Sequence, residues 1–292
     1  MARFGRLLTA MITPFMPDGK VDYAAAAALA KRLVENGSDG LVVAGTTGES
    51  PTLSAEEKLR LFSTIVEAVG GTASVIAGTG SYATGESIQL TKEAEKTGVD
   101  GILLVAPYYN RPPQEGLYRH FKAVAEATSL PVMIYNIPGR TGVNVSPETM
   151  ARLARVDNIV ALKESAGNLA QVSELVRRLP PDFMIYSGDD VLTLPMMALG
   201  AVGVVSVASH VAGRKVKEMI EAFLRGETSQ ANRIHQALLP LFNVLFITTN
   251  PIMVKTAVNL LGIPVGGVRL PLVNATSEEI SQLKEVMQGL GL

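Results

Sequence analysis

The sequence predicts an α/β protein, a (β/α)8 TIM barrel with a small C-terminal helical appendage. Eight short apolar runs alternate with stretches of helical periodicity along the chain of 292 residues. The runs are continuously apolar, which is typical of parallel strands covered by helices on both faces. The chain length also suits one barrel of this kind. An open doubly wound sheet is the main alternative.

The predicted strands are short β-rich runs at fairly even spacing. They cover residues 7–13, 40–44, 74–77, 101–106, 132–135, 159–163, 183–186 and 203–207. Helical periodicity marks the stretches 23–35, 55–69, 85–97, 115–127 and 168–178 between them. Because strands and helices alternate along the chain, the strands are expected to run parallel.

Local start and stop signals support these helices. Ser54 with Glu57 three residues later predicts a capping box, and Ser146-Pro147 places a proline at a first helical position. Glycines follow several helical runs, as expected where the backbone enters the left-handed region at a helix end: Gly37, Gly70, Gly71 and Gly98.

The chain continues in helical segments after the eighth strand, for longer than one barrel helix requires. We therefore divide it into a barrel that carries the active site, residues 1–224, and a C-terminal helical extension, residues 225–292. The most apolar later stretch, 238–247, is shorter than the roughly 20 residues that span a bilayer. We predict a buried helix there.

Composition excludes several classes of function. The 26 basic and 27 acidic residues are interspersed, which leaves no electrostatic footprint for nucleic acid or an anionic membrane. The absence of cysteine excludes disulfides, zinc-thiolate sites and thiol catalysis. The chain begins without the apolar stretch of an export signal, so we expect a cytoplasmic protein. The histidines are scattered, at 120, 210 and 235, and no metal site is expected.

One lysine does not fit the strand that contains it. Lys163 lies in an apolar run where a charge is costly, and desolvation favours the neutral amine of a buried lysine. A neutral amine is a nucleophile whose characteristic partner is a carbonyl, with which it forms a Schiff base. The alternatives are that Lys163 pairs with Glu164 or reaches solvent. Lys255 is the chief rival nucleophile, but we expect its amine to extend to solvent from a helix beyond the barrel.

Other reactive side chains lie where predicted strands end, which is where barrel enzymes build their active sites. Tyr135 and Tyr109 can supply hydroxyls for proton transfer, and the Thr46 hydroxyl can link them. The turn at Thr46 and Thr47 exposes backbone N–H groups suited to a carboxylate. Arg140 can bind a second carboxylate with two hydrogen bonds.

Two further motifs have simpler explanations. Residues 78–83 match a loose dinucleotide-binding pattern, but the next strand is followed by no acidic residue for a ribose. The pair Asp189-Asp190 is acidic enough to suggest a metal, yet it precedes a helix. We expect it to cap that helix.

Three motifs at the predicted strand ends carry a family resemblance: Gly45-Thr46-Thr47-Gly48-Glu49, Tyr135-Asn136-Ile137-Pro138 and Lys163-Glu164. They resemble the signatures of the dihydrodipicolinate synthase / N-acetylneuraminate lyase family, and the resemblance covers essentially the whole chain. The tyrosine pair Tyr108-Tyr109 and Arg140 are more similar to the synthase branch than to the aldolases.

The resemblance implies that Lys163 forms a Schiff base with pyruvate and that no other cofactor is needed. It implies a proton relay of Tyr135, Thr46 and Tyr109, with Tyr109 donated across an interface of a homotetramer built from two dimers. The remaining implied contacts are with pyruvate at Thr47 and Val205, with the pyruvate pocket at Gly188, and with the carboxylate of aspartate semialdehyde at Arg140.

The expected reaction is condensation of pyruvate with L-aspartate 4-semialdehyde to give 4-hydroxy-tetrahydrodipicolinate, a step of lysine and diaminopimelate biosynthesis. One alternative is a pyruvate-dependent aldolase of the same family, acting on N-acetylneuraminate or a 2-keto-3-deoxy sugar acid. Another is a catalytically silent 2-oxo-acid-binding protein.

In family members that are inhibited by lysine, the resemblance places an allosteric pocket at six positions: Ser50, Ala55, Lys58, Tyr82, Glu86 and Tyr108. Ala55, Lys58 and Tyr82 depart from the histidine and asparagine pattern of the sensitive enzymes. Because the cation of Lys58 opposes a cationic ligand, we predict weak or absent inhibition by lysine.

Overall fold

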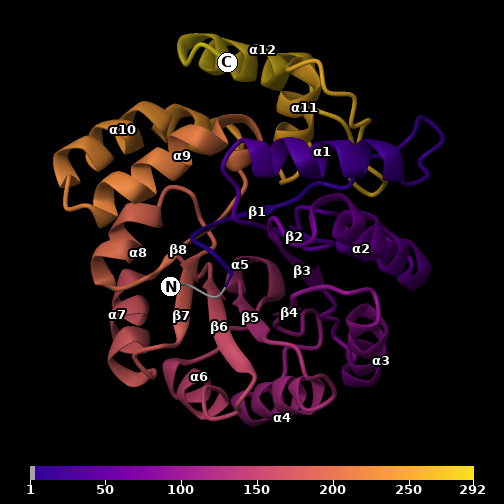
Figure 1. Ribbon diagram of the computed structural model, residues 1–292, viewed down its shortest axis with the longest axis vertical. Coiled ribbons are helices and arrows are strands. Elements are labelled where there is room, and N and C mark those ends of the chain that lie inside the picture. The colour runs from indigo at the N-terminus through magenta and orange to yellow at the C-terminus, as the bar shows by residue number, and fades with distance from the viewer. Residues whose placement is uncertain (1–3) are drawn as a thin grey trace.

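Eight parallel strands close into a barrel in the computed structural model, which describes residues 4–292 (Figure 1). Residues 1–3, part of the N-terminal segment used to argue against an export signal, lie outside the described residues. Neighbouring strands pair in chain order, and the pairing of the last strand with the first excludes an open sheet. The strands are β1 Leu7–Ala10, β2 Gly40–Val43, β3 Ser74–Gly78, β4 Gly101–Val105, β5 Val132–Asn136, β6 Ile159–Glu164, β7 Met184–Ser187 and β8 Gly203–Ser206.

Helices surround the barrel, as predicted. The covering helices are α1 Tyr23–Glu35, α2 Ala55–Val69, α3 Thr84–Glu95, α4 Gln114–Ala125, α6 Pro147–Leu153, α7 Leu169–Arg178, α8 Thr193–Leu199 and α9 Ser209–Leu224. Two short helical turns lie at the carboxyl ends of strands, η1 Ser50–Thr52 and α5 Pro138–Thr141. The five helices outlined from periodicity agree with the structure to within two residues at each end.

The predicted capping signals are largely confirmed. Ser54 and Glu57 exchange both hydrogen bonds of a capping box at the start of α2, at 3.1 and 3.0 Å. Ser146 accepts a hydrogen bond from the Thr149 N–H at the start of α6. Three of the predicted helix-end glycines have a positive φ: Gly37, Gly71 and Gly98. The prediction for Gly70 was wrong, because it ends α2 with φ −56° and Gly71 makes the turn.

The barrel has an inner and an outer core. Apolar residues that face outward from the strands pack against the helices. The inner cluster contains Leu8, Val42, Ile76, Leu103, Met133, Tyr135, Ala161, Tyr186 and Val205. Because strand side chains alternate between faces, Lys163 points inward with Ala161, two residues before it. The inner layer thus delivers Tyr135 and Lys163 to the carboxyl end of the barrel.

Three helices follow the barrel: α10 Thr228–Val244, α11 Ile252–Leu260 and α12 Ser277–Gly289. They gather on the side of the barrel where α9 and α1 lie (Figure 1). Residue 224, where we divide the chain, is the last residue of α9, and the division itself remains a prediction. The apolar stretch 238–247 begins inside α10, where Leu238, Leu241 and Phe242 are buried. Among residues 4–292, no helix has the length and apolar character that crossing a membrane requires.

Candidate active site

A cavity of about 380 Å³ opens at the carboxyl ends of β2 to β5. Its wall includes Thr46 from the turn after β2, Tyr108 and Tyr109 from the loop after β4, Tyr135 from β5 and Arg140 from α5. The structure therefore brings together residues that lie almost 100 positions apart in the sequence. A concave site with converging hydroxyl groups and one guanidinium suits a small polar substrate.

Lys163 lies next to Tyr135 of this wall, although Lys163 is not itself among the residues that line the cavity. It pairs with Tyr135 in the register of β5 and β6, and its Nζ atom is 4.0 Å from the centre of the Tyr135 ring. The side chain is buried, with 5% of its surface exposed. An amine held this way, against an aromatic face at a strand end, can reach a carbonyl that enters the cavity.

The Glu164 carboxylate is occupied by groups other than Lys163. It accepts hydrogen bonds from Asn136 Nδ2 at 3.0 Å, from the Ala166 N–H at 2.6 Å and from Gln171 Nε2 at 3.3 Å. Burial raises the pKa of Glu164, and the hydrogen bond from Asn136 opposes that rise. This network ties the end of β5 to the end of β6, beside Lys163. Sequence reasoning missed the part played by Asn136, although a polar residue closing an apolar strand was a signal for it.

Gly188 and Ser165 lie immediately beside Lys163. A Cβ atom at Gly188 would lie 1.8 Å from Ser165 Oγ and 3.0 Å from Lys163 Cε, so this position has no room for a side chain. The Ser165 Oγ atom is buried, and it has no hydrogen-bond partner within residues 4–292. Gly188 thus lies next to Lys163, and the prediction that it borders a pyruvate pocket remains a prediction.

The turn after β2 is shaped by backbone hydrogen bonds. The Glu49 N–H donates to the Thr46 carbonyl at 3.0 Å, and the Ser50 N–H donates to the Gly45 carbonyl at 3.2 Å. Glu49 itself adopts a left-handed backbone with φ 57°. Within residues 4–292, the N–H groups of Thr46 and Thr47 donate to no backbone carbonyl, which leaves them available to an anion.

Two predicted contact residues lie deeper than the cavity wall. Thr47 is buried, and its Oγ1 accepts a hydrogen bond from Asn250 Nδ2 at 2.8 Å. Val205 is buried in the inner core with Tyr135. The Thr47 hydroxyl is thus occupied by Asn250, and the predicted contacts of Thr47 and Val205 with pyruvate remain predictions.

Tyr109 and Arg140 lie at the outer edge of the cavity. Tyr109 has 92% of its surface exposed and adopts a left-handed backbone with φ 66°. In the single chain most of the Tyr109 side chain therefore faces solvent, and the predicted relay with Tyr135 and Thr46 is incomplete. Arg140 donates from its guanidinium to the Asn250 carbonyl at 3.2 Å.

A second cavity, of about 530 Å³, adjoins the first. All six residues of the predicted allosteric pocket line it: Ser50, Ala55, Lys58, Tyr82, Glu86 and Tyr108. Ser50 and Tyr108 also line the first cavity, so the two cavities share a wall. Burial lowers the pKa of Lys58, and the charge of Glu86 partly opposes this shift.

Comparison with known proteins now assigns the chain to a family. The family model described as the dihydrodipicolinate synthetase family matches residues 3–290. The chain belongs to this family. The resemblance drawn from the strand-end motifs is thereby confirmed, and membership makes the chain a lyase, as expected.

Relatives match over nearly their full length. The 4-hydroxy-tetrahydrodipicolinate synthase of Desulforamulus reducens is 63% identical over 99% of this chain and 98% of its own. The synthase of Heliobacterium modesticaldum is 61% identical over 99% of this chain and 96% of its own. The solved dihydrodipicolinate synthase of Aquifex aeolicus is 50% identical with a TM-score of 0.97, and that of Cyanidioschyzon merolae, solved with lysine bound, is 52% identical with a TM-score of 0.98; each covers 99% of both chains.

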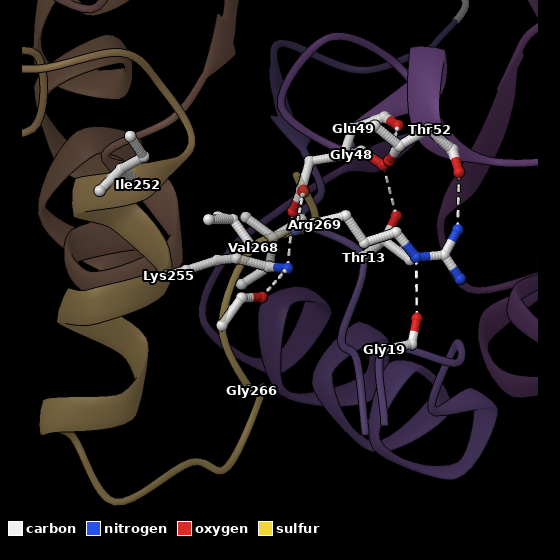
Figure 2. A network of polar contacts seen from close by, with 12 residues as sticks. Thr13, Gly19, Gly48, Glu49, Thr52, Ile252, Lys255, Gly266, Val268 and Arg269 are labelled. Atoms are coloured by element: carbon white, nitrogen blue, oxygen red, sulfur yellow. Dashed lines mark hydrogen bonds and ion pairs between the residues drawn. The ribbon is translucent and has the colours of Figure 1, made fainter. Parts of the chain in front are cut away.

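In this member of the family, Lys255 is buried, and our expectation that its amine extends to solvent was wrong. Its Nζ forms an ion pair with Glu49 at 2.6 Å and donates to the Gly267 carbonyl at 2.6 Å (Figure 2). Burial lowers the pKa of Lys255 to about 8, and the charge of Glu49 opposes the shift. Although its pKa suits a nucleophile, both partners occupy the amine, which leaves no place for a substrate carbonyl.

The prediction that Asp189-Asp190 caps a helix was also wrong. Helix α8 begins at Thr193, and the residue before it makes no side-chain cap. Asp190 is buried and accepts hydrogen bonds from Ser206 Oγ and from the N–H groups of Val207 and Ala208. Its carboxylate thus closes the loop after β8, where three donors converge.

The glycines of the dinucleotide-like motif serve close packing between strands. A Cβ at Gly78 would lie 2.4 Å from the Ala44 carbonyl oxygen, and one at Gly80 would lie 2.5 Å from the Val105 nitrogen. The family match likewise favours lyase chemistry over nicotinamide chemistry. Among residues 4–292, no three histidine, aspartate or glutamate side chains gather as metal ligands would.

Proposed function

We propose that this chain condenses pyruvate with L-aspartate 4-semialdehyde to give 4-hydroxy-tetrahydrodipicolinate, through a Schiff base on Lys163. The observation that carries the proposal is the buried Lys163 amine, 4.0 Å from the centre of the ring of Tyr135, which lines the first cavity. Support comes from the relatives, since those that are 63% and 61% identical are named for this product. The reaction is a step of lysine and diaminopimelate biosynthesis.

In the proposed reaction, the Lys163 amine attacks the keto carbon of pyruvate and forms a carbinolamine. Loss of water gives the Schiff base, and loss of a methyl proton gives an enamine, which attacks the aldehyde carbon of the semialdehyde and becomes an imine again. The amino group of the semialdehyde then attacks this imine carbon, which closes the ring and releases the Lys163 amine. The carbinolamine step moves protons to and from oxygen. Tyr135, Thr46 and Tyr109 are the groups that carry them, and no cofactor beyond the covalent adduct is required.

Substrate carboxylates have two seats in this proposal. The pyruvate carboxylate binds the free N–H groups of Thr46 and Thr47, since a turn of this kind attracts anions. Gly188 leaves room beside the lysine, and Val205 supports the pocket floor. Arg140, on the outer wall of the cavity, binds the carboxylate of the semialdehyde.

A homotetramer with Tyr109 donated across an interface is part of the proposal. The supporting observation is the exposure of Tyr109, 92% of whose surface is open in the single chain. A large aromatic side chain on a left-handed backbone gains by packing against a second copy, and its hydroxyl would then serve the neighbouring site. We also place the protein in the cytoplasm.

The second cavity is proposed to bind lysine weakly. The relative from Cyanidioschyzon merolae was solved with lysine bound. Here the cavity holds the cation of Lys58 as well as the carboxylate of Glu86, so a second ammonium group meets repulsion as well as attraction.

The Schiff base is tested by trapping. The protein is incubated with pyruvate, reduced with borohydride and digested, and the modified peptide is identified by mass spectrometry. The expected adduct is on the peptide of Lys163, with the peptide of Lys255 unmodified and no adduct without pyruvate. An adduct elsewhere, or none, would refute the assignment.

A second assay identifies the acceptor. It compares the rate of condensation of pyruvate with the semialdehyde and the rates of cleavage of N-acetylneuraminate and of 2-keto-3-deoxy sugar acids.

A further inference from the structure

The turn that offers its N–H groups to the substrate ends at a buried carboxylate. Glu49, its last residue, has 1% of its side chain exposed and a left-handed backbone. Such a backbone is strained for a residue with a side chain, so something must hold it. The Glu49 carbonyl accepts from Thr52, and the Gly48 carbonyl accepts from Thr13 Oγ1 at 2.7 Å.

Lys255 binds the carboxylate of Glu49, whereas Thr13 and Thr52 bind backbone carbonyls of the turn. Its Nζ reaches from α11 to Glu49 Oε1 and also donates to the Gly267 carbonyl (Figure 2). The same Nζ lies 4.0 Å from the centre of the Phe15 ring. The amine thus bridges the turn after β2 and the loop that follows α11. Segments more than 200 positions apart meet at one buried ion pair.

Arg269, in the same loop, fixes the other carboxylate oxygen. Its N–H donates to Glu49 Oε2 at 2.9 Å. Its guanidinium donates to the carbonyls of Gly19 and Thr52 (Figure 2). The guanidinium also pairs with Glu57 on α2. Helix α11 and the loop after it therefore supply a donor to each oxygen of the Glu49 carboxylate.

The same C-terminal region also contacts the two groups proposed to bind substrate carboxylates, the Thr46-Thr47 turn and Arg140. Asn250, just before α11, donates to Thr47 Oγ1 at 2.8 Å, and its carbonyl accepts from Arg140 at 3.2 Å. Two independent contacts, at Thr47 and at Glu49, thus run from the α11 region to one five-residue turn. Precise placement of a binding group depends on such supporting contacts.

We propose that the buried Glu49–Lys255 ion pair positions the Thr46-Thr47 turn to bind the carboxylate of the substrate. This inference rests on the proposed function: the ion pair would set the affinity of the Thr46-Thr47 turn for pyruvate. A buried ion pair adds little net stability over an apolar pair of similar volume, so stability alone does not account for this one. Lys255 and Glu49 are positioning residues, since other groups of the protein occupy the Lys255 amine and both oxygens of the Glu49 carboxylate.

The test compares a single variant with a double variant, so that an effect on pyruvate binding can be told apart from a loss of stability. Lys255→Met alone leaves an unpaired carboxylate in the core, which lowers Tm by roughly 10 °C. The double variant Glu49→Gln with Lys255→Met removes both charges, so its Tm returns close to that of the wild type. The measured quantities are Tm, kcat and the pyruvate concentration that gives half-maximal borohydride trapping on Lys163.

If the pair positions the turn, the double variant needs about tenfold more pyruvate for half-maximal trapping, with kcat changed less than about twofold. If the pair only stabilises the fold, the pyruvate concentration for half-maximal trapping returns to the wild-type value along with Tm, and the inference is overturned. Should the double variant not fold, Glu49→Gln decides by the same criterion. The buried Lys255, whose pKa is already near 8, can then lose its proton.

A matched control is the ion pair between Asp39 and Lys217. The pair is partly buried; Asp39 directly precedes β2, at the opposite end of that strand from the turn, and Lys217 lies on α9. Asp39→Asn with Lys217→Met should leave half-saturation unchanged. A wild-type protein that traps no pyruvate overturns the proposed function, whereas a wild-type adduct with unaltered affinity in the double variant overturns only this inference.

Discussion

Lys163 and Tyr135 lie opposite one another on neighbouring strands, with the lysine Nζ 4.0 Å from the centre of the tyrosine ring. Parallel register and the alternation of side chains place both in the inner layer of the barrel, at its carboxyl end. An amine and a phenol hydroxyl therefore lie side by side on adjacent strands, and Tyr135 lines the first cavity. In the proposed reaction this pairing supplies the nucleophile and a proton carrier.

The Tyr135 hydroxyl is expected to be needed for turnover. Tyr135→Phe keeps the ring that contacts Lys163 and removes only the proton carrier, so kcat should fall by about 10²- to 10⁴-fold. Steady-state kinetics of the condensation measures the change, and circular dichroism checks that the fold is retained. A kcat within a factor of two of the wild type would remove Tyr135 from the mechanism.

Gly188 is expected to accept no side chain. In Gly188→Ala, the new methyl group would meet Ser165 Oγ at 1.8 Å and Lys163 Cε at 3.0 Å, and it would displace the amine. Trapping on Lys163 at a fixed pyruvate concentration should fall about tenfold. Adding Ser165→Ala frees part of the space and should restore part of the signal. Gly289→Ala, where no atom lies within 4 Å, is the control; equal trapping in all three variants would contradict this account.

Donation of Tyr109 across an interface can be tested by mixing two inactive variants. Tyr109→Phe lacks the relay hydroxyl, and Lys163→Met lacks the amine. If Tyr109 serves the neighbouring chain, a mixed oligomer combines an intact amine with an intact hydroxyl, and activity returns after the two are unfolded and refolded together. If Tyr109 serves its own chain, no site in the mixture is complete, and the activity stays at the level of the separate variants.

Much of this fold follows from local patterns in the sequence. Continuous apolar runs and capping signals such as Ser54 with Glu57 depend on nearby residues, which explains why the strands and the five outlined helices were located to within a few residues. The candidate site was predictable for a related reason. In a parallel barrel, every strand carries its last residues to the same end, so Thr46, Tyr135 and Arg140 had to converge.

Partners supplied by distant segments were not predictable. Lys255 looked like a helix residue with a solvent-exposed amine because its partner, Glu49, lies more than 200 positions earlier. Asp190 looked like a helix cap because its donors come from the end of β8 and the loop after it, 16 or more positions later. In both cases the neighbouring residues in the sequence fitted a common role, an exposed lysine or a helix cap. The actual partner became visible only in the folded barrel.

Inhibition by lysine is expected to be weak. The initial rate should stay unchanged across millimolar lysine, because the cation of Lys58 lies in the cavity that would receive the ligand. Lys58→Gln removes that cation and leaves Glu86, so lysine should bind more tightly and begin to inhibit. Lys92→Gln removes the same charge from an exposed position on α3 and serves as control. Strong, saturable inhibition of the wild type would contradict the prediction.

His210 is expected to weaken the fold in acid. Its Nε2 accepts from the Ile12 N–H at 3.1 Å and its Nδ1 lies 2.8 Å from the Val207 carbonyl, so the neutral ring has a defined role. Burial lowers the pKa of His210 to about 4, although the hydrogen bond to Val207 opposes the shift. In the unfolded chain the pKa of a histidine is about 6.5.

Between pH 6.5 and pH 4 the unfolded state therefore binds a proton that the folded state does not, and the free energy of unfolding falls as the pH falls. The contribution of this residue is about 3 kcal/mol over the full window. His210→Gln keeps an acceptor for the Ile12 N–H and cannot titrate. Urea unfolding at several pH values should show a shallower acid decline for this variant than for the wild type, and parallel declines would contradict the assignment.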